Sequence, residues 1–246
     1  MNKRLTQDSI FNGKVTVKQD RVGYRFSIDA VILAHCVRPK PGERVVDLGT
    51  GCGIVPLIIG YRHPATHMFG IVIQKELADI AEINIRENGM QAKIRILRRN
   101  LETIQPVMFQ GPVDIVVSNP PFRKTASGRI NPNPQRAVAR HEISVTLLGV
   151  VKAASDILKK GGVFILIYTS ERLSELIQHM QTCGLEPKHM RFIHSRTDSE
   201  SKLFMMEGVK QGRPGLKVGP PIVIYDENGV YTEEIEGMFH SGELPA

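Results

Sequence analysis

Four consecutive residues have the types needed to hold an amino group beside a reactive partner: Asn119, Pro120, Pro121 and Phe122. Two prolines fix the backbone and supply no N–H donors, so the Asn119 amide oxygen and the Pro120 carbonyl remain as acceptors. We expect them to bind the N–H groups of a planar amino group on a base or an amide and to direct its lone pair toward an incoming reactive group. Phe122 would then stack on the base that carries the amine. The alternative is a turn with a proline pair and no chemistry.

A second chemical signal is an acidic residue followed by alternating glycines: Asp47, Gly49, Gly51 and Gly53. Glycines let the backbone turn tightly and approach a ligand closely. The spacing is neither the dinucleotide fingerprint nor a P-loop, and an acid at this position would repel a pyrophosphate. It suits a ligand with an amino group and no phosphate, such as the methionine part of S-adenosylmethionine. The alternative is a purely structural turn.

Alternating elements must position these two segments. Strands are predicted for five apolar runs, at residues 45–49, 69–73, 94–97, 113–117 and 163–168. Helices are predicted between them, at residues 54–61, 75–88 and 145–160. This order predicts an α/β fold of the Rossmann-like kind, with a mostly parallel sheet covered by helices on both faces. Two further strand-like runs, at residues 190–194 and 203–209, predict an antiparallel edge.

The ends of the chain flank this core. Residues 23–30 open an apolar helix that runs to about Val37, with Ser27 as its expected N-cap. Residues 212–221 are rich in glycine, proline and basic side chains, which predicts an irregular exposed segment. We expect one domain over residues 1–246, consisting of a flank or lid, a cofactor-binding core and a C-terminal segment, at residues 1–40, 41–210 and 211–246.

Composition adds a partner hypothesis. The formal net charge is +7, which favours polyanions such as tRNA, although many basic proteins bind no nucleic acid. A basic series follows the proline pair and is expected either to contact phosphates or to form a solvated face: Arg123, Lys124, Arg129, Arg136 and Arg140. Three scattered cysteines match no metal motif, and no apolar run suits a membrane span or secretory signal. These features predict a cytoplasmic protein without a metal site.

Taken with the two chemical segments, residues 23–30 and 215–227 make the chain resemble the bacterial valine-tRNA adenine-N6 methyltransferase family over essentially its whole length. The resemblance implies an S-adenosylmethionine cofactor and methylation of an adenine N6 in tRNA. It implies that Asp47, Gly49 and Gly51 bind the cofactor and that Phe26 and Asp29 close over its methionine end. By the same resemblance, Asn119 and the three residues after it hold the adenine.

Two positions depart from the family pattern. Val72 stands where a glutamate that binds the ribose hydroxyls is usual, and Asn100 stands where an aspartate that contacts the cofactor adenine is expected. Loss of the ribose-binding carboxylate at Val72 predicts cofactor binding weaker by roughly tenfold to a few hundredfold, which Gln74 or Glu76 would partly offset. Asn100 keeps a carbonyl acceptor and should cost less. Two alternatives therefore stay open: a glutamine N5-methyltransferase acting on a protein, and a cofactor-impaired homologue that binds RNA.

Overall fold

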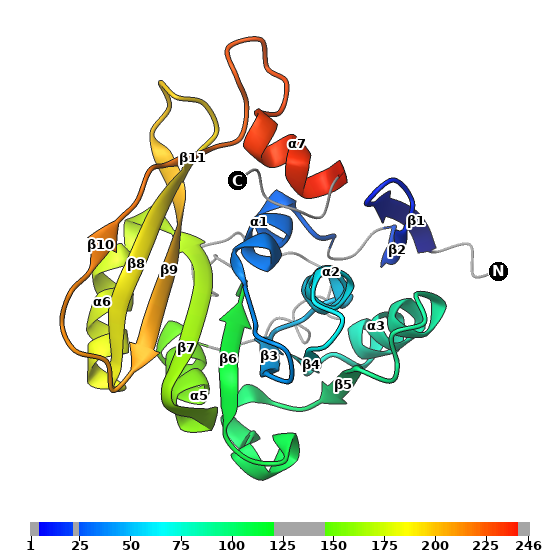
Figure 1. The fold of residues 1–246 in the computed structure, drawn as a ribbon, viewed down its shortest axis with the longest axis horizontal. Helices are drawn as coiled ribbons and strands as arrows, with labels where there is room; N and C mark the ends of the chain where they lie inside the picture. The colour runs from blue at the N-terminus through cyan, green and yellow to red at the C-terminus, as the bar shows by residue number, and fades with distance from the viewer. Residues whose placement is uncertain (1–4, 22–24, 121–145, 241–246) are drawn as a thin grey trace, which may run out of the picture.

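The computed structural model describes residues 5–21, 25–120 and 146–240 (Figure 1). Its centre is a nine-stranded sheet in the order β10-β8-β9-β7-β6-β3-β4-β5, with β11 also paired to β8. The strands are β3 (Arg44–Leu48), β4 (His67–Val72), β5 (Ile94–Arg98), β6 (Val113–Ser118), β7 (Leu158–Thr169), β8 (Leu185–His194), β9 (Ser201–Lys210), β10 (Lys217–Val218) and β11 (Ile222–Val223).

The strands from β5 to β7 run parallel, and β9 is inserted antiparallel between β7 and β8. The predicted α/β fold, a mostly parallel sheet with an antiparallel edge, is therefore confirmed. The long crossover from β6 to β7 and the hairpin from β8 to β9 explain the two arrangements, because parallel neighbours need a crossover whereas antiparallel neighbours need only a loop.

Helices cover both faces of the sheet (Figure 1). One face packs against α1 (Ile28–Cys36), α2 (Ile54–Arg62) and α3 (Lys75–Glu87). The other face packs against α5 (Leu147–Ile157) and α6 (Leu173–Thr182). Successive residues of β3 serve the two layers in turn, since Val45 belongs to the first core and Val46 to the second. Burial on both faces accounts for the continuous apolar runs in the sequence.

One expectation about a helix end was wrong, and another was confirmed. The helix predicted for residues 145–160 ends at Ile157, because Leu158 begins β7 and pairs with Val113 of β6. The helical periodicity of the sequence continues through Leu158 into the two lysines after it. Strand pairing and burial of Leu158 outweigh that local preference. Ser27 is the N-cap residue of α1, as predicted, and has the extended backbone of an N-cap. Its hydroxyl makes no capping bond and instead donates to Asp29 Oδ2 at 2.7 Å.

Several elements were not anticipated. The chain begins with a β-hairpin of β1 (Leu5–Ile10) and β2 (Val15–Asp20), which lies beside α3 (Figure 1). The helices α6 and α7 (Glu233–His240) were also missed. The segment at residues 212–221 is mainly exposed, as predicted, although β10 within it adds two residues parallel to β8. Within the described ranges, no helix has the length and apolar character to cross a membrane.

Candidate active site

The glycine segment forms the turn between β3 and α2. Gly49, Gly51 and Gly53 have φ values of 86°, 57° and 86°, in the left-handed region that favours glycine. The backbone N–H groups of Gly49 and Thr50 both donate to the Ile71 carbonyl at 2.9 Å, so the turn is fixed to the end of β4. The glycines are therefore required by the backbone path of the turn itself.

The strand β6 ends next to this turn. In the register of β3 and β6, Ser118 lies opposite Leu48, and the buried Ser118 hydroxyl donates to the Leu48 carbonyl at 2.8 Å. Asn119 and Pro120 follow immediately. Sequence reasoning missed Ser118, although its position directly before the Asn-Pro-Pro segment was the available signal.

A cavity of about 210 Å³ opens at these strand ends. Its wall contains residues from both predicted segments, Gly49 and Gly51 from the first and Asn119 and Pro120 from the second. Gln74 and Asn100, which were also predicted to bind the cofactor, lie on the same wall. Arg99 is the charged residue of the wall. The remaining wall residues are apolar: Leu48, Ile71, Val72, Ile73, Leu77, Leu101 and Val150. Apolar walls with a few polar groups suit a flat heteroaromatic ring such as adenine.

Asp47 supplies a test of whether the site fits S-adenosylmethionine. Its side chain is 1% exposed, and its Oδ2 atom has no hydrogen-bond partner among the described residues. Burial raises the pKa of this carboxyl to about 7, and the Thr50 hydroxyl partly opposes the shift. A buried acceptor without a partner is costly. Asp47 does not itself line the cavity, but the next two residues, Leu48 and Gly49, do. The ammonium group of a methionine moiety would satisfy the carboxylate, so the residues present fit this cofactor.

The two departures from the family pattern both fall on the cavity wall. Val72 is the last residue of β4, is 5% exposed and presents an apolar surface there. Of the two residues expected to compensate, Gln74 lines the cavity, whereas Glu76 is exposed and is not part of the wall. Asn100 Oδ1 accepts a hydrogen bond from the Glu102 backbone at 3.0 Å. An amide oxygen can accept two such bonds, so it retains one lone pair for a ligand.

Other predicted site residues lie away from the wall or outside the described ranges. Phe26 and Asp29 do not line the cavity; the Phe26 N–H donates to Gln19 Oε1 at 2.8 Å, and Asp29 accepts from Ser27. Seven predicted residues fall outside the described part of the chain: Pro121, Phe122, Arg123, Lys124, Arg129, Arg136 and Arg140.

The cysteines show no sign of reactivity. Burial raises the pKa of the Cys36 and Cys52 thiols to about 11, which keeps both protonated at neutral pH. In the portion of the chain that the structure describes, no cluster of three or more histidine, cysteine or acidic side chains could hold a metal ion.

The sheet topology, the ligand cavity at the carboxyl ends of the strands and the unpaired buried acid define an S-adenosylmethionine-dependent methyltransferase. Comparison with known proteins agrees: the methyltransferase small domain family matches residues 25–193. The chain belongs to that family.

Curated relatives carry a more specific name. A tRNA1(Val) (adenine(37)-N6)-methyltransferase of Bacteroides thetaiotaomicron is 28% identical over 63% of this chain and 64% of its own length. The protein of the same name from Porphyromonas gingivalis (strain ATCC 33277) is 26% identical over 89% of this chain and 88% of its own. The chain thus aligns with somewhat less than two thirds of the first relative and with most of the second.

Solved structures share the fold. A predicted O-methyltransferase from Agrobacterium tumefaciens superposes with a TM-score of 0.71 and 18% identity, over 89% of this chain and 98% of its own. Geranyl diphosphate C-methyltransferase from Streptomyces coelicolor, solved with S-adenosyl-L-homocysteine, superposes with a TM-score of 0.52 and 14% identity, over 74% and 78%. At these identities the likeness concerns the fold alone.

Proposed function

We propose that this methyltransferase transfers a methyl group to the exocyclic N6 of an adenine in tRNA. The observation that carries the proposal is the shared cavity wall, on which Asn119 and Pro120 stand beside Gly49 and Gly51. Two N–H acceptors next to a cofactor turn suit an amine substrate better than a hydroxyl substrate. The name of the curated relatives and the net charge of +7 both favour tRNA as its carrier.

Bound S-adenosylmethionine would supply the electrophilic methyl group. The glycine turn and Asp47 would hold its methionine part, and Leu77, Leu101 and Asn100 would surround its adenine. The Asn119 side-chain oxygen and the Pro120 carbonyl would accept hydrogen bonds from the substrate amine. The amine lone pair would form the bond to the methyl carbon as the sulfur–methyl bond breaks, S-adenosylhomocysteine would leave, and the methylated nitrogen would lose one proton to water. Such a step needs no strong base, so catalysis would depend on positioning and exclusion of water.

The residues after Pro120 would contact the substrate base and the tRNA that carries it. Pro121 and Phe122 would close the base pocket, with Phe122 stacked on the flipped adenine. The basic series from Arg123 to Arg140 would contact tRNA phosphates, which fixes orientation without reading sequence. Phe26, two residues before α1, and Asp29, in its first turn, remain proposed neighbours of the methionine end.

The test is methyl transfer to defined acceptors. Purified protein is incubated with tritiated S-adenosylmethionine and tRNA from a strain that lacks the protein, and nucleosides are identified by mass spectrometry. We expect label in N6-methyladenosine, which should also be absent from tRNA of the deletion strain. A parallel incubation replaces tRNA with a bacterial release factor, and label in a glutamine of that protein instead would assign the protein acceptor. Binding of tRNA without measurable cofactor binding would favour the cofactor-impaired alternative, to which the apolar Val72 points.

A further inference from the structure

The N-terminal hairpin contacts α3 through two asparagine amides that lie one helical turn apart. Asn84 Oδ1 accepts from the Lys18 N–H at 2.8 Å, and its Nδ2 donates to the Lys18 carbonyl at 2.9 Å. Asn88 repeats the arrangement with Thr16, at 2.9 Å and 2.7 Å. Residues four apart share one helix face, and residues two apart share one strand edge. Each amide therefore pairs with β2 as a residue of a neighbouring strand would.

Of these two amides, only that of Asn84 also contacts the glycine turn between β3 and α2. Asn84 Nδ2 donates a further hydrogen bond to the Cys52 carbonyl at 2.9 Å, and Cys52 lies between Gly51 and Gly53. The second bond of Asn88 Nδ2 stays within α3, at the Asn84 carbonyl. Asn84 is 1% exposed, so water does not compete for these bonds.

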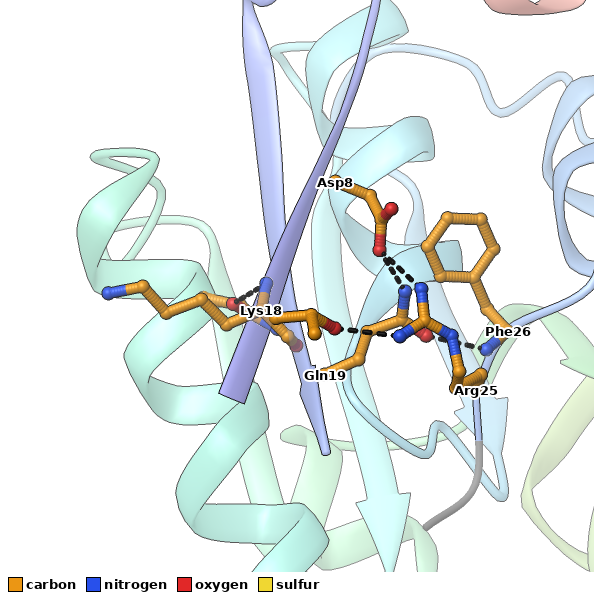
Figure 2. Close-up of polar contacts among 7 residues, drawn as sticks. Asp8, Lys18, Gln19, Arg25 and Phe26 are labelled. Carbon is orange, nitrogen blue, oxygen red and sulfur yellow. Dashed lines mark hydrogen bonds and ion pairs between the residues drawn. The ribbon is translucent and has the colours of Figure 1, made fainter. Parts of the chain in front are cut away.

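The same strand also fixes the segment that enters α1. Gln19, 1% exposed, accepts from the Phe26 N–H at 2.8 Å and donates to Asp8 Oδ2 at 2.7 Å. The Arg25 guanidinium donates to the same Asp8 oxygen at 2.9 Å, and Figure 2 shows Gln19 and Arg25 converging on Asp8. Figure 2 also shows Lys18 facing the opposite way, toward α3. Lys18 of β2 is linked through Asn84 to the glycine turn, and Gln19 of β2 is bonded to Phe26 before α1. The strand therefore connects these two segments.

We infer that Asn84 is a positioning residue that couples docking of the hairpin to binding of S-adenosylmethionine. The inference rests on the proposed role of the glycine turn in holding the cofactor. Holding the Cys52 carbonyl restricts the turn on both sides of Cys52, and restriction before binding strengthens affinity. Coupling is reciprocal, so bound cofactor must stabilise the docked hairpin by the same factor.

The matched variants are Asn84→Ala and Asn88→Ala. Both remove an amide that pairs with β2, but only the first removes the bond to Cys52. Calorimetry with S-adenosylhomocysteine should show a dissociation constant raised about 3- to 10-fold in Asn84→Ala and changed less than about twofold in Asn88→Ala. The melting temperature should fall in both. Equal effects on the dissociation constant in the two variants would overturn the inference.

Hydrogen exchange in the unaltered protein tests the reciprocal effect and does not depend on whether a variant folds. Adding S-adenosylhomocysteine should slow exchange of the Lys18 amide by about the same 3- to 10-fold as it slows the glycine-turn amides. The Gly219 amide, bonded to Met190 beside β10, serves as the reference that should not change. Protection of the turn without protection of Lys18 would overturn the coupling alone. No protection of the turn would overturn the cofactor assignment and the inference with it.

Discussion

The Ser118 hydroxyl donates a 2.8 Å hydrogen bond to the Leu48 carbonyl and so joins the ends of β6 and β3. The residue after Leu48 opens the glycine turn, and the residue after Ser118 is the proposed ligand of the substrate amine. The pairing of β3 with β6 brings the two halves of the cavity wall together, and this buried bond adds a side-chain link at the strand ends. In-line methyl transfer is sensitive to the spacing between the two halves, because a displacement of about 1 Å can lower a rate roughly a hundredfold.

The first prediction concerns this bond. Ser118→Ala should lower kcat about 5- to 50-fold and change the dissociation constant of S-adenosylhomocysteine by less than about threefold. The expected loss of unfolding free energy is about 1 kcal/mol. Steady-state methyl transfer, binding calorimetry and urea unfolding measure these three quantities.

Ser155→Ala is the matched control for Ser118→Ala. The Ser155 hydroxyl is also largely buried and donates to a backbone carbonyl, that of Cys183, at 2.7 Å. Its bond joins α5 to the end of α6, and neither residue lines the cavity. We expect a similar loss of stability without loss of kcat. Equal kcat values in the two variants would show that the Ser118 bond has no part in positioning.

The second prediction concerns Asn119. Asn119→Ala should reduce methyl transfer below about a hundredth of the original rate, because the substrate amine loses a side-chain acceptor. Cofactor affinity should fall by less than about threefold, since the glycine turn and Asp47 are unchanged. Turnover within about threefold of the unaltered protein would remove Asn119 from its proposed role.

The third prediction concerns Val72. Val72→Glu should tighten binding of S-adenosylhomocysteine by about tenfold or more, because the new carboxylate would accept hydrogen bonds from the ribose hydroxyls. Arg99 on the same wall would favour its ionised form. Val72→Gln, with similar length and no charge, is the control and should gain less. A dissociation constant that stays the same or rises in Val72→Glu would place the ribose elsewhere.

The fourth prediction is a pH dependence caused by Asp47. Only its ionised form pairs with the cofactor ammonium, and burial raises the pKa of the carboxyl in the free protein to about 7. Affinity should therefore rise about tenfold between pH 6 and pH 8, with proton release on binding. Calorimetry in buffers of different ionisation enthalpy measures both quantities. In Asp47→Asn, binding should be weaker and should not change over this range.

The same raised pKa makes the cofactor-free protein less stable as pH rises, whereas it makes cofactor binding stronger. The folded state holds the Asp47 proton more tightly than the unfolded state does. The stabilisation from that proton is present at low pH and is lost as pH rises from about 4 to about 7. Urea unfolding of the unaltered protein and Asp47→Asn should show a difference that grows over this interval. A constant difference would contradict the raised pKa.

Local pattern was sufficient for most of the sheet. The strands β3, β4, β5 and β6 and the helices α2 and α3 match the predicted segments to within about two residues at most ends. The end of α5 could not be predicted in this way, because Leu158 fits either a helix or a strand until β6 lies beside it. The hairpin of β1 and β2 was missed because its stability depends on Asn84 and Asn88, some seventy residues further along the chain.

The sequence by itself determined the chemistry available to this protein. An acid at the end of one strand with three glycines following it, and an asparagine with prolines after another strand, are properties of adjacent residues that can be read without knowledge of packing. Tertiary structure alone decided how those groups meet. The pairing of β3 with β6, to which the Ser118–Leu48 bond adds, places the two segments on one wall. Asn84 connects the turn to the N-terminal hairpin. Both depend on tertiary structure, because hydrogen bonds between distant residues exist only once the sheet has assembled.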